Sequence, residues 1–244
     1  MKLAVSACVA AIVIATGWFV IADGWSWSDS ANAQYQELRD LAGFTDIVLN
    51  GDIGVEIMQG DEFLVEVEAS DDALGGLHTV LEGTTLDIHP GAGSRRFFGL
   101  FATDYEVRVT LPELKSLTAS RGAEVDGAYT LTGGTLALIA RSGSEFDLAI
   151  DVASIEIEVS GGSDMDLSGT AGTSTIHVRG GSEFSGGDFI AEDVTVDISG
   201  GSEAFLTVTN RITGSASGGS VLVYQGNPVT VEVSSSRNAS VVRR

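Results

Sequence analysis

The chain has 244 residues, of which 43% are hydrophobic, 31 are glycine and three are proline. This length is sufficient for one large domain, and many glycines with few prolines indicate numerous tight turns. The formal net charge of −21 argues against nucleic acid as a partner, because phosphate binding requires a basic surface. The single cysteine, Cys8, lies near the start and leaves the later part of the chain without a thiol.

The N-terminus carries an uncharged apolar run over residues 3–22, directly after Lys2. As a secretory signal, this run would be cleaved after Ala22 or Ala33, where small residues precede the bond. As an uncleaved anchor, it is long enough to cross a bilayer and would hold the protein at the membrane. Both interpretations export the rest of the chain to the periplasm or cell envelope.

From Phe44 onward, apolar residues alternate with polar ones, which is typical of strands with one buried face. We expect the less regular early strands to begin a stack of coils. The clearest of these segments are 47–49, 51–57, 63–68, 85–88 and 105–110, with a looser connection at 70–81 and a turn at 111–114.

Residues 93–101 interrupt two strands with an unusual composition. They bring two cations and three aromatic rings together in an acidic chain: Arg95, Arg96, Phe97, Phe98 and Phe101. Exposed aromatic and arginine clusters mark interaction sites, so these five residues are the candidate partner-binding residues. Alternatively, the phenylalanines cap the end of the fold while the arginines meet acidic neighbours.

The stretch 117–224 repeats one short phrase six times, as in Gly-Gly-Ser-Asp at 161–164. The central glycines are Gly122, Gly143, Gly162, Gly181, Gly201 and Gly219, and they are 18 to 21 residues apart. A repeat near this length with glycine at a fixed place is typical of a solenoid. Because glycine adopts positive φ without steric strain, each is expected at a corner where one strand turns into the next.

Apolar residues stand three and five positions before and after most of these glycines, with polar residues between them. Coils stacked about 4.8 Å apart would pair their backbones in a parallel ladder and join the apolar columns into one core. We therefore predict an all-β fold, a single right-handed parallel β-helix with coils of about 20 residues. Its final strand, near 229–233, could pair with another copy to form a homo-oligomer.

The predicted domain organisation has four parts. They are a signal peptide or membrane anchor with a polar tether at 1–33, a linker at 34–43, the β-helix at 44–235 and a polar tail at 236–244.

Two segments and the repeats that follow them resemble a known bacterial family. The segments read GDIGVEIMQGD at 51–61 and VRVTLPELKSL at 107–117. Together with the Gly-Gly-Ser-acid repeats, they are similar to the family called the putative auto-transporter adhesin, head GIN domain, over residues 44 to about 235. The resemblance implies a right-handed β-helix in an envelope protein of unassigned biochemistry, and it implies no catalytic residue.

Acidic residues occupy equivalent places in successive repeats. One file is Glu124, Glu145, Asp164, Glu183 and Glu203, and a second, two residues on, is Asp126, Asp147 and Asp166. Stacked carboxylates repel one another, and calcium would relieve the repulsion. The calcium candidates are Glu145, Asp147, Asp164 and Asp166. The alternative is a solvated acidic edge that keeps the solenoid soluble.

A polysaccharide-acting enzyme is an alternative function, with Asp126, Asp147 and Asp166 as acid and base. These residues have no histidine nearby in the sequence, and we expect no aromatic platform for a sugar within the regular repeats. Turn serines recur in every repeat, which argues against any one as a nucleophile. We therefore predict a non-enzymatic envelope protein without a cofactor. It would serve adhesion, scaffolding or ligand binding, with an envelope protein or a glycan as partner.

Overall fold

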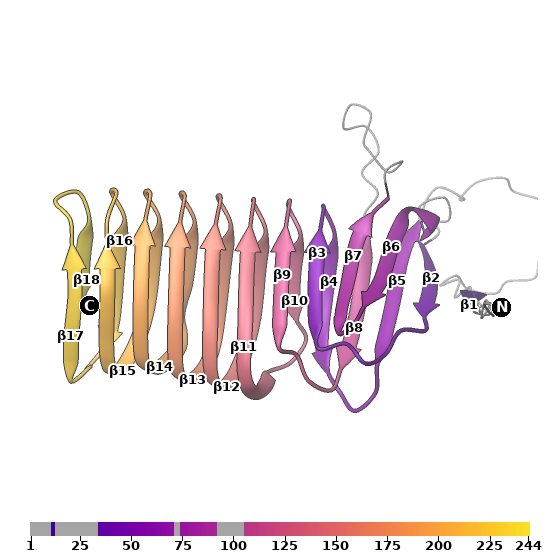
Figure 1. Cartoon of the computed structure of the whole chain (residues 1–244), viewed down its shortest axis with the longest axis horizontal. Coiled ribbons are helices and arrows are strands. Elements are labelled where there is room, and N and C mark those ends of the chain that lie inside the picture. The colour runs from indigo at the N-terminus through magenta and orange to yellow at the C-terminus, as the bar shows by residue number, and fades with distance from the viewer. Residues whose placement is uncertain (1–10, 13–33, 71–73, 92–104) are drawn as a thin grey trace, which may run out of the picture.

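The computed structural model describes residues 11–12, 34–70, 74–91 and 105–244. Strands dominate this part, and its one helical segment is a single 3-10 turn, η1 (Leu74–Gly76). The strands form one sheet that winds about a long axis, so that they stand side by side along the molecule (Figure 1). The predicted parallel β-helix is confirmed as a β-solenoid of about seven turns with coils of about 19 residues.

The regular part of the solenoid contains eight strands. They are β9 (Ser116–Ser120), β10 (Glu124–Gly127), β11 (Leu131–Arg141), β12 (Glu145–Ser160), β13 (Asp164–Arg179), β14 (Glu183–Ser199), β15 (Glu203–Ala216) and β16 (Val221–Gly226). Each coil has two faces. Face A is formed by the residues directly after a glycine turn, and face B is formed by the residues directly before the next glycine turn. The glycine turns line up along one edge (Figure 1). Coils pair in parallel, for example β12 with β13.

Each glycine turn uses two left-handed residues, and a buried serine follows them in every turn but the first, where Ala123 stands. Each of the six predicted glycines has positive φ, between 71° and 83°. The Ser163 hydroxyl donates to the Ser160 carbonyl oxygen (2.9 Å). It also accepts from the N–H groups of Gly143 and Ser144 in the preceding coil, at 3.1 and 3.2 Å. These serines therefore link successive coils, which explains why they recur.

The core consists of apolar columns that run along the axis. One face B column contains Leu117, Leu138, Ile157, Ile176 and Val196, all fully buried. Gly214 is the next member of this column. A Cβ at Gly214 would lie 1.9 Å from the Val196 carbonyl oxygen, so close backbone approach excludes a side chain there.

The early strands begin the stack, as expected, but not in chain order. The strands concerned are β3 (Asp46–Asn50), β4 (Gly54–Gln59), β7 (Thr85–Pro90) and β8 (Glu106–Leu111). The coil formed by β3 and β4 pairs in parallel with β9 and β10 on one side. On its other side it pairs with β7 and β8. The chain thus leaves this coil, builds outward, and returns past it to continue the solenoid.

Antiparallel strands cover the N-terminal end of the stack. They are β1 (Ala11–Ile12), β2 (Gln34–Arg39), β5 (Leu64–Ser70) and β6 (Leu77–Glu82). β5 pairs with β8, β6 with β7, and β2 with β5. Residues 34–43, expected as a linker, thus contribute a strand. This strand pairs with β5 on one side and with the two residues of β1 on the other, and Leu38 is 45% exposed. It therefore lacks the apolar alternation of a buried strand.

The last coil contains β17 (Thr230–Ser235), which pairs with β15, and β18 (Ser240–Arg243), which pairs with β16. Residues 236–244, expected as a polar tail, therefore include a strand. Four residues with only two apolar side chains are too short a pattern to predict it.

Among the described residues, no helix is long and apolar enough to cross a membrane. Most of the run 3–22 lies outside the described residues, so the signal and anchor interpretations stay predictions.

Candidate functional site

Face A carries the two predicted acidic files as two adjacent outward columns. The register places Glu124, Glu145, Asp164, Glu183 and Glu203 in one column, and Asp126, Asp147 and Asp166 in the other. All eight side chains are exposed. We call these eight residues the acidic face. Because successive coils are about 4.8 Å apart, each carboxylate has like charges on its neighbours along the axis.

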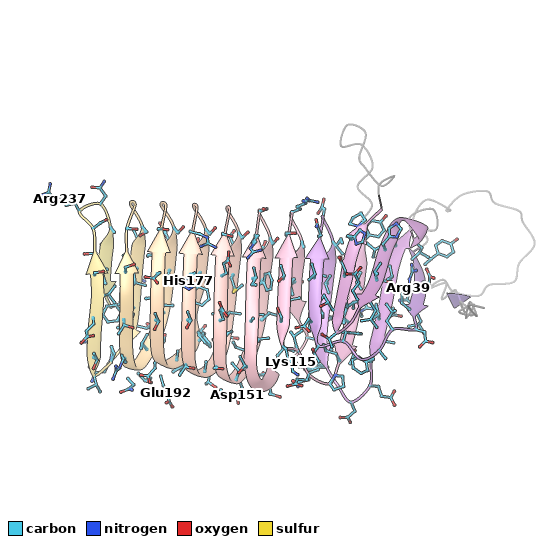
Figure 2. The ribbon with its side chains drawn as sticks, viewed as in Figure 1. Arg39, Lys115, Asp151, His177, Glu192 and Arg237 are labelled. Carbon is cyan, nitrogen blue, oxygen red and sulfur yellow. The ribbon has the colours of Figure 1, made fainter. Side chains whose placement is uncertain are left out.

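The acidic face has no cation of its own. Residues 121–205 contain three basic residues besides His177: Arg121, Arg141 and Arg179. Arg121 lies in a glycine turn, and the other two lie on face B, where both donate hydrogen bonds to Glu158. His177 also lies on face B (Figure 2). Within the part of the chain that the structure describes, neighbouring basic side chains therefore do not compensate the charge of the acidic face.

Carboxylate proximity changes the titration of the second column. Partial burial raises the pKa of Asp126, and the charges of Asp147 and Glu56 raise it further. Partial burial likewise raises the pKa of Asp166, together with the charges of Asp147 and Asp188. Keeping the carboxyl groups of the second column ionised therefore costs electrostatic free energy.

At its N-terminal end, the second column continues into a compensated cluster. Arg108 lies next to Glu56 in register, and its guanidinium donates to Glu56 and Glu66 at 3.2 and 3.3 Å. Partial burial lowers the pKa of Arg108, but the hydrogen bond to Glu66 and the three surrounding glutamates outweigh it and raise that pKa overall. This cluster joins β4, β5 and β8 at the N-terminal end of the stack, and no such ion pair is found among the described residues of the acidic face beyond it.

At its C-terminal end, the second column becomes apolar. Ser185 is followed in register by Phe205, Val223 and Val242. The Phe205 ring packs against Gly187, where a Cβ would lie 2.6 Å from the ring, and the Arg244 guanidinium lies 5.8 Å from the ring centroid. Phe205 and Val223 are partly exposed and Val242 is 42% exposed. We call Phe205, Val223 and Val242 the apolar stripe.

An aromatic side chain, that of Phe205, lies on the outer surface of the regular repeats. Phe205 points outward on face A because it stands four residues after Gly201. Asp126, Asp147 and Asp166 stand in the same place after their own glycines. The alignment of the repeats therefore places Phe205 on the outer surface from the sequence alone.

The four calcium candidates are brought together as two register pairs, Glu145 with Asp164 and Asp147 with Asp166. In the part of the chain that the structure describes, however, no group of three or more His, Cys, Asp or Glu side chains could hold a metal ion. Calcium binding stays a prediction. The candidate partner-binding residues Arg95, Arg96, Phe97, Phe98 and Phe101 lie outside the described residues.

The turn serines are not placed as nucleophiles. Ser144, Ser163, Ser182, Ser202 and Ser220 are buried, with at most 2% of each residue exposed. Their hydroxyls donate to main-chain carbonyl oxygens three residues back. A buried hydroxyl that is already hydrogen-bonded cannot reach a substrate, which favours the structural role.

Comparison with known proteins agrees with the fold. The family model described as "Putative auto-transporter adhesin, head GIN domain" matches residues 43–228. A search of curated proteins finds no match.

Solved structures with the same fold include a "putative adhesin" from Bacteroides fragilis NCTC 9343. It is 17% identical, with a TM-score of 0.79 over 86% of this chain and 97% of that one. A "putative adhesin" from Parabacteroides distasonis ATCC 8503 is 14% identical, with a TM-score of 0.66 over 88% and 98%. A "putative lipid binding protein" from the same strain is 16% identical, with a TM-score of 0.57 over 88% and 98%. At these identities the likeness shows the fold alone.

Proposed function

Because the chain belongs to the family described as putative auto-transporter adhesin, head GIN domain, we propose that it is a non-enzymatic, adhesin-like protein of the cell envelope. Face A is its binding surface. The observation that carries the proposal is the sequence of outward residues along one column, from Asp126, Asp147 and Asp166 to the apolar stripe.

A rigid ladder suits this role because its backbone is fixed before a partner arrives. Each position in the acidic face is held by backbone pairing on both sides, so binding orders little of the protein. An uncompensated anionic surface accelerates the encounter with a cationic partner. The apolar stripe supplies surface that gains free energy when it is covered.

The partner that fits is a cationic segment of another envelope protein that also presents an apolar group. A glycan with amino groups shares the charge and is the alternative partner. The uncharged run 3–22 supports an exported location, either as a cleaved signal or as an anchor. Intact mass and fractionation from native cells distinguish these two states.

The test is binding of the purified protein to envelope extracts of its own cells. A triple variant of face A, Asp126→Asn with Asp147→Asn and Asp166→Asn, is expected to lose binding at least about tenfold, and so is Phe205→Ser. The matched control carries the same charge change on face B, with Glu156→Gln, Asp193→Asn and Asp197→Asn. Equal losses in both triple variants would mean that net charge, rather than face A, controls binding.

The polysaccharide-acting alternative rests on the raised pKa values of Asp126 and Asp166. The same face A triple variant tests it. Glycan turnover by the wild type that disappears in the variant, while the circular dichroism spectrum is unchanged, would favour the enzyme over the adhesin.

The calcium-stabilised alternative makes a separate prediction. Chelator should lower the melting temperature, and millimolar calcium should raise it, in the wild type but not in Glu145→Gln with Asp166→Asn. Identical melting in chelator and in calcium would eliminate calcium as a structural ligand.

A further inference from the structure

The core columns reach the C-terminal end of the solenoid without a cover. Val231 continues the column of Ile212, and Val241 continues that of Leu222. Ile212 and Leu222 are fully buried, whereas Val231 is 46% exposed and Val241 is only partly buried. Within the described residues, the last coil therefore presents a cross-section of the core to solvent.

The backbone of this last coil is also open. In β18, the N–H of Ser240 donates to the Ser220 carbonyl oxygen, and the N–H of Arg244 donates to Tyr224. Successive backbone groups in a strand point to opposite sides, so those of Val241 and Arg243 point away from β16. Neither β17 nor β18 contains proline, and both ladders with the preceding coil are free of bulges. Prolines and bulges are two of the features that protect natural edge strands from pairing with another chain, and this edge has neither.

We propose that this open coil is an interface with a second copy of the chain, arranged end to end about a two-fold axis. The edge comprises two strands, β17 on face B and β18 on face A, joined as one coil. A partner that pairs both strands must present the same cross-section, and the identical coil of another copy does so. The two-fold arrangement makes the pairing antiparallel and lets the valine columns of the two copies meet.

The opposite end of the solenoid does not offer this match. There the outermost strands of the described part are β1 and β6, and each runs antiparallel to the strand it pairs with, β2 and β7. A head-to-tail contact would therefore join unlike edges and would continue into a filament, whereas the end-to-end contact closes as a dimer.

The charge of the last coil predicts a salt dependence that distinguishes dimer formation from binding by face A. Residues 227–244 contain three arginines, Arg237, Arg243 and Arg244, and one acidic residue, Glu232. Arg237 lies at the C-terminal tip (Figure 2). Two such coils repel one another weakly, so salt should strengthen the dimer. Salt should instead weaken the binding of a cationic partner to the acidic face.

The experiment measures the mass of the full chain, purified in nonionic detergent, by analytical ultracentrifugation over a range of concentrations. The wild type is expected to form a dimer that tightens between about 50 and 500 mM salt. Val231→Lys, which places a charge on the open end of the core, is expected to raise the dissociation constant at least about tenfold, equivalent to about 1.4 kcal/mol. Val80→Lys is the matched control, since Val80 is 40% exposed at the other end of the solenoid.

Val241→Pro is a second variant, because it removes an outward N–H and keeps the inward hydrogen bonds of β18. It should also dissociate the dimer, and circular dichroism checks that both variants fold. A monomeric wild type, or species that grow steadily with concentration, would overturn the proposal. A dimer that survives both substitutions would also overturn the proposal. Such a dimer would form elsewhere, for example through residues 3–22, where neither substitution acts.

Discussion

Asp126 and Asp147 are register partners on adjacent coils of face A. Their proximity contributes to the raised pKa of Asp126, after partial burial. A carboxyl group whose pKa is higher in the folded than in the unfolded chain favours folding when it is protonated. That contribution is lost as pH rises through the folded pKa.

Asp126→Asn is therefore expected to raise the melting temperature at pH 7. The gain should shrink as pH falls towards about 3.9, the ordinary pKa of aspartate, because the wild-type carboxyl group is then protonated as well. Thermal melts of both proteins between pH 3 and pH 8 provide the measurement. Asp61→Asn, at an exposed turn, serves as control, and an equal gain there would assign the effect to net charge.

Glu158→Gln should have the opposite pH dependence. The hydrogen bond from Arg141 lowers the pKa of Glu158; partial burial opposes this, and Arg179 reinforces it. The stabilisation is present above the unfolded pKa and is lost as pH falls through the folded one. We expect the variant to lose about 1 kcal/mol at pH 7 and much less at pH 3. Urea melts measure this difference, with the exposed Glu156→Gln as control.

Gly214→Ala is expected to destabilise the solenoid by about 3 kcal/mol. Gly214 has φ of 135°, and the added methyl group would lie 1.9 Å from the Val196 carbonyl oxygen. Gly133→Ala is the comparison, because a Cβ there meets no atom within 4 Å. If chemical denaturation gave similar losses for both, backbone crowding at Gly214 would be the wrong explanation.

Ser142→Gly is expected to stabilise the protein by about 0.5 to 1 kcal/mol. Ser142 has φ of 57°, in the place that glycine occupies in the later turns. Glycine removes the steric strain of this conformation, although it adds entropy to the unfolded chain. Differential scanning calorimetry measures this gain in stability. Ser142→Ala keeps the strain, so its stability should not rise above that of the wild type.

The repeats were predictable because their contacts are local in sequence. Each glycine aligns one coil with the next, so the inward columns and both acidic files follow from spacing alone, as Asp147 and Asp166 illustrate. Phe205 could have been placed by the same alignment. In these coils, the distance of a residue from the turn glycine determines whether its side chain is buried.

The antiparallel strands at the N-terminal end and the last coil were not predictable in this way. The Arg108 cluster joins residues from β4, β5 and β8, and nothing in their spacing indicates that they meet. β2 lies between β5 and the two residues of β1, and β18 is an edge strand. The exposure of both strands removes the alternation that marks buried strands. Their position depends on tertiary pairing, which a single sequence pattern does not encode.

The insertion of the β3–β4 coil between later strands has a consequence for the order of folding. Asp46 pairs with Ser116, whereas Glu145 pairs with Asp164 in the very next coil. Pairings that close long loops form slowly, and those between neighbouring repeats form quickly. The repeats can therefore assemble first and act as a template. The segment synthesised before them must wait for that template, which makes the N-terminal half the last to complete its pairing.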